Sequence, residues 1–158
     1  MKMMRIASLF IASVFIFSAA AFARPNVKLT LGQMLVTQVN GKTTLSDVPS
    51  DGAKRGSTLR YTIVAKNVGD QPALALEPIG NVPPGETFVG GSASHNGSIQ
   101  YTLDKKAWSA QPMVEVKLAN GKMVKRPADP STFAAVRWVV AKIAPKQSLS
   151  FTYEVRIK

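Results

Sequence analysis

The 158-residue sequence contains no cysteine and only one histidine, His95. A disulfide is therefore excluded, and so is a metal site built from several histidine or cysteine ligands. Calcium requires clustered oxygen ligands, yet Asp47 and Asp51 merely flank a Pro-Ser loop and Asp129 stands alone. A glycine-rich phosphate loop followed by Lys and Ser or Thr is also missing. The sequence thus predicts neither a metal nor any other cofactor.

Catalytic groupings are equally scarce. His95 lies in a loop rich in Gly, Ser and Asn, and a turn needs such small polar residues in any case. A catalytic triad requires a nucleophile, a base and an orienting acid in mutual contact, which this loop does not indicate. The glutamates that could pair as acid and base on a sugar fall on separate predicted elements: Glu77, Glu86 and Glu115. No catalytic residue is predicted, and we expect the chain not to be an enzyme.

Acidic residues are few, with 9 Asp and Glu against 20 Lys and Arg. Without Lys2 and Arg5, which belong to the leader described below, 18 basic and 9 acidic residues leave a net charge of +9. Such a balance favours anionic partners, although charge spread along a chain also serves solubility. Nucleic-acid binding would need exposed aromatic residues on a basic face. Most aromatic residues fall at positions that face the core in the predicted strands, so no nucleic-acid partner is expected.

Only one long apolar run is present, at residues 6–17. Lys2 and Arg5 precede it, and Ala21-Phe22-Ala23 follows it with the small-x-small form of a signal-peptidase site. A membrane anchor is the alternative, but a spanning helix needs about 20 apolar residues. We therefore expect residues 1–23 to be a signal peptide cleaved after Ala23. The mature chain is then exported to the periplasm or the cell surface, or secreted, without a transmembrane segment.

Sustained helical periodicity is also lacking beyond the leader. Instead, residues 58–69 and 149–157 alternate between apolar and polar side chains, as strands with one buried face do. About ten such short strands, separated by Asn-Gly and Pro-Gly turns, predict an all-β fold, an antiparallel β-sandwich with these two runs at its middle. Residues 72–79, with Pro at both ends, are predicted as an edge strand. Trp138 is the predicted buried aromatic at the centre of the core.

The N-terminal part, residues 24–56, is predicted as a strand and hairpin with a linker loop, packed on a sandwich core of residues 57–158. Val27, Leu29 and Leu31 alternate with polar residues, and Gly32 predicts a β-bulge. Asn40-Gly41 predicts a hairpin turn. Since that turn gives the strand a local partner, pairing within its own sandwich is favoured. The alternative is pairing with a neighbouring molecule by strand addition.

Three segments resemble a known family: TLRYTIVAKNVGDQPA, NVPPGETFVGGSA and RWVVAKIAPKQSLSFTYEVRI. They are similar to the conserved-repeat domain of bacterial and archaeal surface and secreted proteins, a family of unknown function. The resemblance spans roughly residues 55–158 and implies an immunoglobulin-like sandwich. Family members often carry tandem copies, whereas this chain has one. The residues that carry the resemblance are structural ones: Tyr61, Asn67, Gly69, Pro83, Pro84, Gly85, Trp138 and Pro145.

The remaining candidates concern binding. Trp108 lies in a polar turn beside Lys105 and Lys106; it either stacks on a sugar or partner side chain or caps the sandwich, and the cap is favoured. Lys125 and Arg126 form a further basic pair in a predicted loop. We expect a non-enzymatic exported β-sandwich that acts in protein interaction or cell-envelope structure, with an envelope or surface protein as partner. The alternatives are a basic binding module for an anionic envelope polymer and a subunit of a surface assembly formed by strand addition.

Overall fold

The computed structural model describes residues 25–158, so the predicted signal peptide lies outside the described residues. Within this range the chain forms β-strands and one turn of 3-10 helix, η1 (Pro130–Thr132). The strands are β1 (Val27–Val39), β2 (Lys42–Ser46), β3 (Thr58–Asn67), β4 (Ala73–Leu76), β5 (Ile79–Asn81), β6 (Glu86–Phe88), β7 (Ser98–Thr102), β8 (Met113–Lys117), β9 (Met123–Pro127), β10 (Ala135–Ile143) and β11 (Ser148–Ile157).

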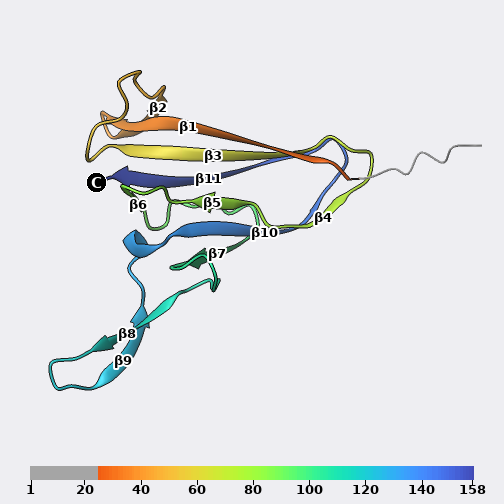
Figure 1. The fold of residues 1–158 in the computed structure, drawn as a ribbon. Helices are drawn as coiled ribbons and strands as arrows, with labels where there is room; N and C mark the ends of the chain where they lie inside the picture. The colour runs from red at the N-terminus through yellow and green to blue at the C-terminus, as the bar shows by residue number, and fades with distance from the viewer. Residues whose placement is uncertain (1–24) are drawn as a thin grey trace, which may run out of the picture.

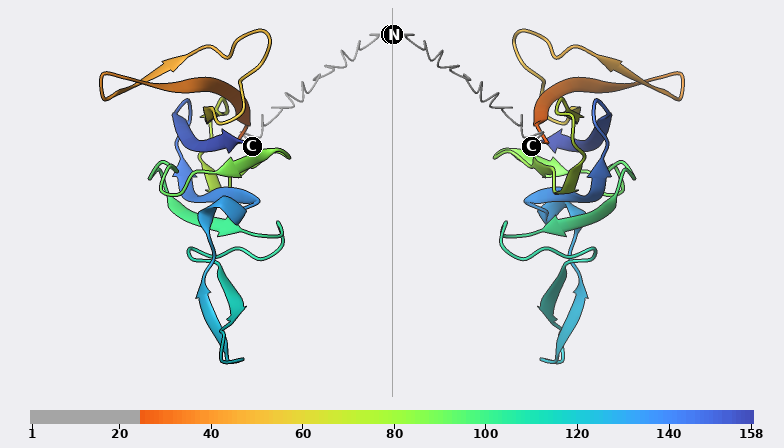
Figure 2. Two further views of the ribbon diagram at one scale, coloured as in Figure 1. Left: turned by 90° about the vertical axis from the view of Figure 1, so that its left-hand side faces the viewer. Right: turned by 90° about the vertical axis from the view of Figure 1, so that its right-hand side faces the viewer.

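Two antiparallel sheets form the body of the molecule (Figure 1). The first sheet has the order β2-β1-β3-β11-β6. In the second sheet, β4 and β5 lie along one edge of β10 and β7 pairs with the other edge. The sheets are stacked as two layers, and the β8–β9 hairpin projects from them (Figure 2). The predicted all-β sandwich is confirmed, with β3 and β11 paired at the middle of the first sheet.

The core lies between the two sheets. On β3 the alternating side chains are buried as predicted, and β11 buries Phe151, Tyr153 and Val155 in the same way. Trp138 on β10 is fully buried, and its ring centroid lies 5.3 Å from that of Phe151. Its indole N–H donates a 2.8 Å hydrogen bond to the Ser94 carbonyl, which satisfies the one polar atom of the side chain. The prediction for Trp138 is confirmed.

The N-terminal strand pairs within its own sandwich. β1 lies antiparallel to β3 from Val27 opposite Asn67 to Val36 opposite Thr58. The predicted bulge at Gly32 is wrong, because every residue of β1 along this stretch, Gly32 included, has a single partner on β3. The Asn40-Gly41 turn is present with positive φ angles of 51° and 75°, and it returns the chain into β2.

Two boundaries differ from the sequence expectations. The predicted edge strand at residues 72–79 is divided, since β4 ends at Leu76 and β5 begins at Ile79. Pro78 between them has no N–H to donate, although its carbonyl accepts a hydrogen bond from the Trp138 backbone N–H. Lys125 and Arg126 lie on β9 and not in a loop, where they pair with Glu115 and Val114. The pairing with β8 continues as far as Pro127, so these two residues belong to a strand.

Asn67 lies in the Asn-Val-Gly-Asp stretch that ends the β3 run, where the sequence predicts that Asn and Gly serve a turn because they tolerate its backbone angles. Neither Asn67 nor Gly69 has a positive φ, so the pair does not serve the turn through backbone freedom. Instead the Asn67 side chain is fully buried, and its amide donates hydrogen bonds of 2.7 Å to the Gln71 carbonyl and 3.1 Å to the Ile143 carbonyl. Its oxygen accepts from the Gly69 N–H at 3.1 Å. Asn67 therefore joins the ends of β3 and β10 and the loop before β4.

Candidate interaction surface

Part of the inner face of the first sheet is uncovered. The β1–β3 register places Leu29 opposite Ala65 and Leu31 opposite Ile63, so these leucines share a face with buried residues of β3. Ala65 and Ile63 are 0% and 6% exposed, whereas Leu29 and Leu31 are 61% and 64% exposed. The second sheet covers β3 but leaves the middle of the neighbouring strand β1 uncovered, at Leu29 and Leu31.

A groove runs between β1 and the β4–β5 edge, and we call it the side groove. Its deeper part has a volume of about 280 Å³, and an adjoining hollow shares Leu29 and Ile79 with it. The lining residues come from the two edges and from a floor on β3 and β11, and they include Leu29, Leu31, Ile79, Pro83, Tyr61 and Tyr153. Most of these side chains are apolar or aromatic, which suits contact with another protein.

The two tyrosine hydroxyls on the groove floor are hydrogen-bonded within the chain. The rings of Tyr61 and Tyr153 stack at 5.3 Å, and Gly80 permits this because a Cβ there would overlap the Tyr153 ring. The Tyr61 hydroxyl donates to a Glu86 carboxylate oxygen at 3.3 Å, and the Tyr153 hydroxyl donates to the Asn81 carbonyl at 2.6 Å. Burial raises the pKa of both tyrosines and of Glu86. The floor therefore presents neutral phenols and no activated nucleophile.

The two rims of the groove differ as strand edges. On the β4–β5 side, Pro72 and Pro78 have no N–H to donate, and Ala75 has a positive φ of 51°. These features discourage strand addition. On the β1 side, β2 pairs only with residues from Leu35 to Val39. Within the described residues, β1 from Val27 to Met34 is thus paired with β3 along one edge and with no strand along the other.

Trp108 packs on a cation of its own chain. The Arg137 guanidinium lies 4.7 Å from the centroid of the Trp108 ring. Arg137 also forms an ion pair with Glu77 at 2.7 Å and donates to the Gln100 side chain at 2.7 Å. The tryptophan is half-buried, and its ring packs against this residue of β10. The adjacent Lys105 and Lys106 are exposed in the turn after β7.

The β8–β9 hairpin forms a basic arm that projects from the sandwich (Figures 1 and 2). The arm carries four basic residues and one acidic residue, Glu115, which lies opposite Lys125. Three apolar side chains on it are exposed, namely Met113, Val116 and Met123. The basic residues are Lys117, Lys122, Lys125 and Arg126. The sequence-predicted interaction residues are therefore divided between this arm and the Trp108 turn.

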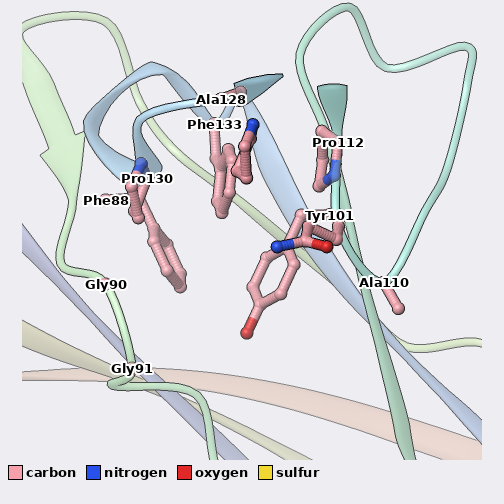
Figure 3. Close-up of a pocket in the computed structure, with 11 residues that line it drawn as sticks. Phe88, Gly90, Gly91, Tyr101, Ala110, Pro112, Ala128, Pro130 and Phe133 are labelled. Atoms are coloured by element: carbon pink, nitrogen blue, oxygen red, sulfur yellow. The ribbon is translucent and has the colours of Figure 1, made fainter. Parts of the chain in front are cut away.

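A second cavity of about 300 Å³ lies where the arm joins the sandwich. Figure 3 shows the rings of Phe88, Tyr101 and Phe133 around this space. The centroids of Tyr101 and Phe133 are 4.7 Å apart, and Phe88 lies edge-on to Tyr101 at 5.5 Å. Its lining contains no carboxylate or histidine. The cavity is an apolar hollow beneath the hairpin.

The groups considered for catalysis are separated or already used. His95 is exposed, and the nearby hydroxyls of Ser92 and Ser94 accept hydrogen bonds from the Glu154 and Thr152 backbone N–H groups. Glu77, Glu86 and Glu115 lie after β4, on β6 and on β8. Among the described residues, no group of three His, Asp or Glu side chains is placed to hold a metal ion.

Comparison with known proteins identifies no relative: no family model, curated protein or solved structure matches the chain. The resemblance to the conserved-repeat domain consequently remains a prediction from the sequence. Its residues occupy structural positions, with Gly85 at a φ of +85° before β6 and Pro145 in the turn between β10 and β11. In residues 25–158 no helix has the length and apolar character needed to cross a membrane.

Proposed function

We propose that the exported chain is a non-enzymatic β-sandwich that binds another protein of the cell envelope or surface through its side groove. The observation that carries this proposal is the exposure of Leu29 and Leu31 on an inner sheet face. Burying apolar surface is favourable by about 25 cal/mol per Å². Two leucines on a face that elsewhere forms the core are suited to be covered by a partner.

A photo-crosslinking experiment tests the groove. A benzophenone amino acid replaces Ile79, which lines the groove and is 45% exposed. The matched control carries it at Leu74, which is 67% exposed but does not line the groove. Illumination of producing cells should yield a defined protein adduct from position 79 and little from position 74. Equal labelling at both positions, or none at position 79, would contradict the proposal.

Export is part of the proposal and rests on the leader pattern of residues 1–23. The intact mass of protein taken from the envelope or the medium should correspond to a chain beginning at Arg24. Recovery of the chain with Met1 in the membrane fraction would contradict it.

A second candidate function is the binding of an anionic envelope polymer, and the basic arm favours it. Reversing both charges in K125E/R126E changes the total charge as much as K105E/K106E does, so the latter is the control. If the arm binds the polymer, the first double variant should leave an acidic polysaccharide matrix at clearly lower salt than the second. If both variants leave the matrix at the same salt concentration, retention depends only on the total charge and the arm is not the binding site.

A further inference from the structure

Within the part of the chain that the structure describes, the free edge of β1 is an unprotected strand edge. The stretch from Val27 to Met34 contains a single charged residue, Lys28, and no proline. Elsewhere in the described chain the edges are short or blunted. β6 has three residues, β2 has five, and the β4–β5 edge carries Pro72 and Pro78. An exposed strand edge without such protection is a template for pairing with another chain.

The same stretch is self-complementary. Val27, Leu29 and Leu31 point to the inner face, and Lys28 and Thr30 point to the outer face. We propose that two copies of the chain pair β1 with β1 in antiparallel fashion, about a two-fold axis through Thr30. This rests on the proposed function and names its partner as a second copy. The two first sheets then become one continuous sheet.

The register follows from the residues at each position. With Thr30 opposite Thr30 of the second copy, Leu29 lies opposite the other copy's Leu31. The exposed leucines of the two chains thus contact one another side by side on the inner face. Lys28 lies opposite Gly32, so no like charges face each other.

The chain's own β2 limits this register. The side of Leu35 that faces away from β3 is already paired with Ser46 of β2. Centring the pair one residue later, on Leu31, would place Leu35 opposite Val27 of the second copy and would require that edge. Centring it on Thr30 pairs residues 27–33 of each copy and leaves Leu35 free for β2.

The absence of cysteine makes a disulfide test direct. In T30C the two introduced thiols lie directly opposite each other, within the Cα separation of under about 7 Å that a disulfide requires. In K28C, on the same strand and the same outer face, they are offset by four residues, about 14 Å. Purified exported T30C should form a covalent dimer under mild oxidation, and K28C should stay largely uncrosslinked.

Sedimentation at micromolar concentration provides the second measurement. The unmodified protein should sediment as a dimer, and L31K should weaken association at least tenfold because it places a charge against the other copy's leucine. L74K is the control, since Leu74 is equally exposed but lies on β4. Added salt should strengthen the dimer, because it screens repulsion between two strongly basic chains.

The outcomes separate this inference from the proposed function. A monomer at these concentrations, or a dimer that T30C does not crosslink, overturns the β1–β1 pairing. A groove adduct from position 79 to a different protein, found together with a monomer, leaves the proposed function standing and removes only the second copy as partner.

Discussion

Asn67 offers a sharp test of how the sandwich ends are held together. Replacing it with aspartate keeps its shape but removes two donated hydrogen bonds, to the Gln71 and Ile143 carbonyls. Each lost bond costs about 1 kcal/mol net, and a carboxylate facing two carbonyl oxygens in a fully buried site adds a desolvation penalty. We therefore expect N67D to lower the free energy of unfolding by about 3 kcal/mol at pH 7.

The control for this variant is N120D. Asn120 is exposed in the β8–β9 turn, and its side-chain oxygen accepts from the Lys122 N–H at 3.1 Å, which a carboxylate can also do. Its change in stability should stay within about 0.5 kcal/mol. Urea unfolding followed by tryptophan fluorescence measures both, and a loss of 3 kcal/mol shifts the midpoint by about 2 M at a slope of about 1.5 kcal/mol per M. Indistinguishable midpoints for N67D and N120D would refute the role assigned to the Asn67 amide.

Three further predictions concern the core and the groove floor. Trp138→Ala should lose about 3 to 5 kcal/mol of unfolding free energy, whereas Trp108→Ala should lose under about 2, since a cation–π contact of about 1 kcal/mol and partial burial are removed; equal losses in denaturant melts would show that the buried tryptophan is misassigned. The pKa of Glu86 is raised by burial, so the folded state binds the proton more tightly and stability should fall as the pH rises from the ordinary glutamate value of about 4.3 through the raised one. Thermal melts between pH 4 and 7 should show this fall as a decrease in the stability of the parent protein relative to Glu86→Gln, because the lowered pKa values of Asp104 and Asp129 act in the opposite direction in both proteins. Gly80→Ala should lose about 1 to 3 kcal/mol because its methyl group meets the ring beneath it, while Gly32→Ala, with open space around it, should be nearly neutral; similar melts for the two glycine variants would argue against the tight approach at Gly80.

The sequence predicts the layers of this fold well, because alternation is a direct consequence of strand geometry. Leu59, Tyr61 and Ile63 are buried where their period-2 pattern places them, and Trp138 occupies the centre. The Asn-Gly turn at residue 40 is also found, since its positive φ angles select these residue types. Local backbone preferences and one-sided burial are readable without knowing the topology.

Side-chain hydrogen bonds between distant segments are not readable in this way. Asn67 stands where a turn residue is expected, yet its amide bonds to Ile143, 76 positions away. Arg137 lies in an alternating strand, yet it packs on Trp108 and pairs with Glu77. Both roles depend on which strands become neighbours, and that is decided by the whole chain.

The side groove also depends on which elements become neighbours, here on how far one sheet extends over the other. An alternating run identifies the face that turns toward a second layer, but it does not reveal whether that layer extends far enough to cover it. Leu29 and Ile63 have the same pattern in the sequence, and they share one face of the first sheet. Ile63 is buried because the second sheet covers β3, whereas Leu29 is exposed because β4 and β5 end that sheet before it reaches β1. The same alternation therefore accompanies a core residue on the inner strand and an exposed apolar residue on the outer one, and the free edge beside Leu29 is where we propose that a second chain extends the sheet.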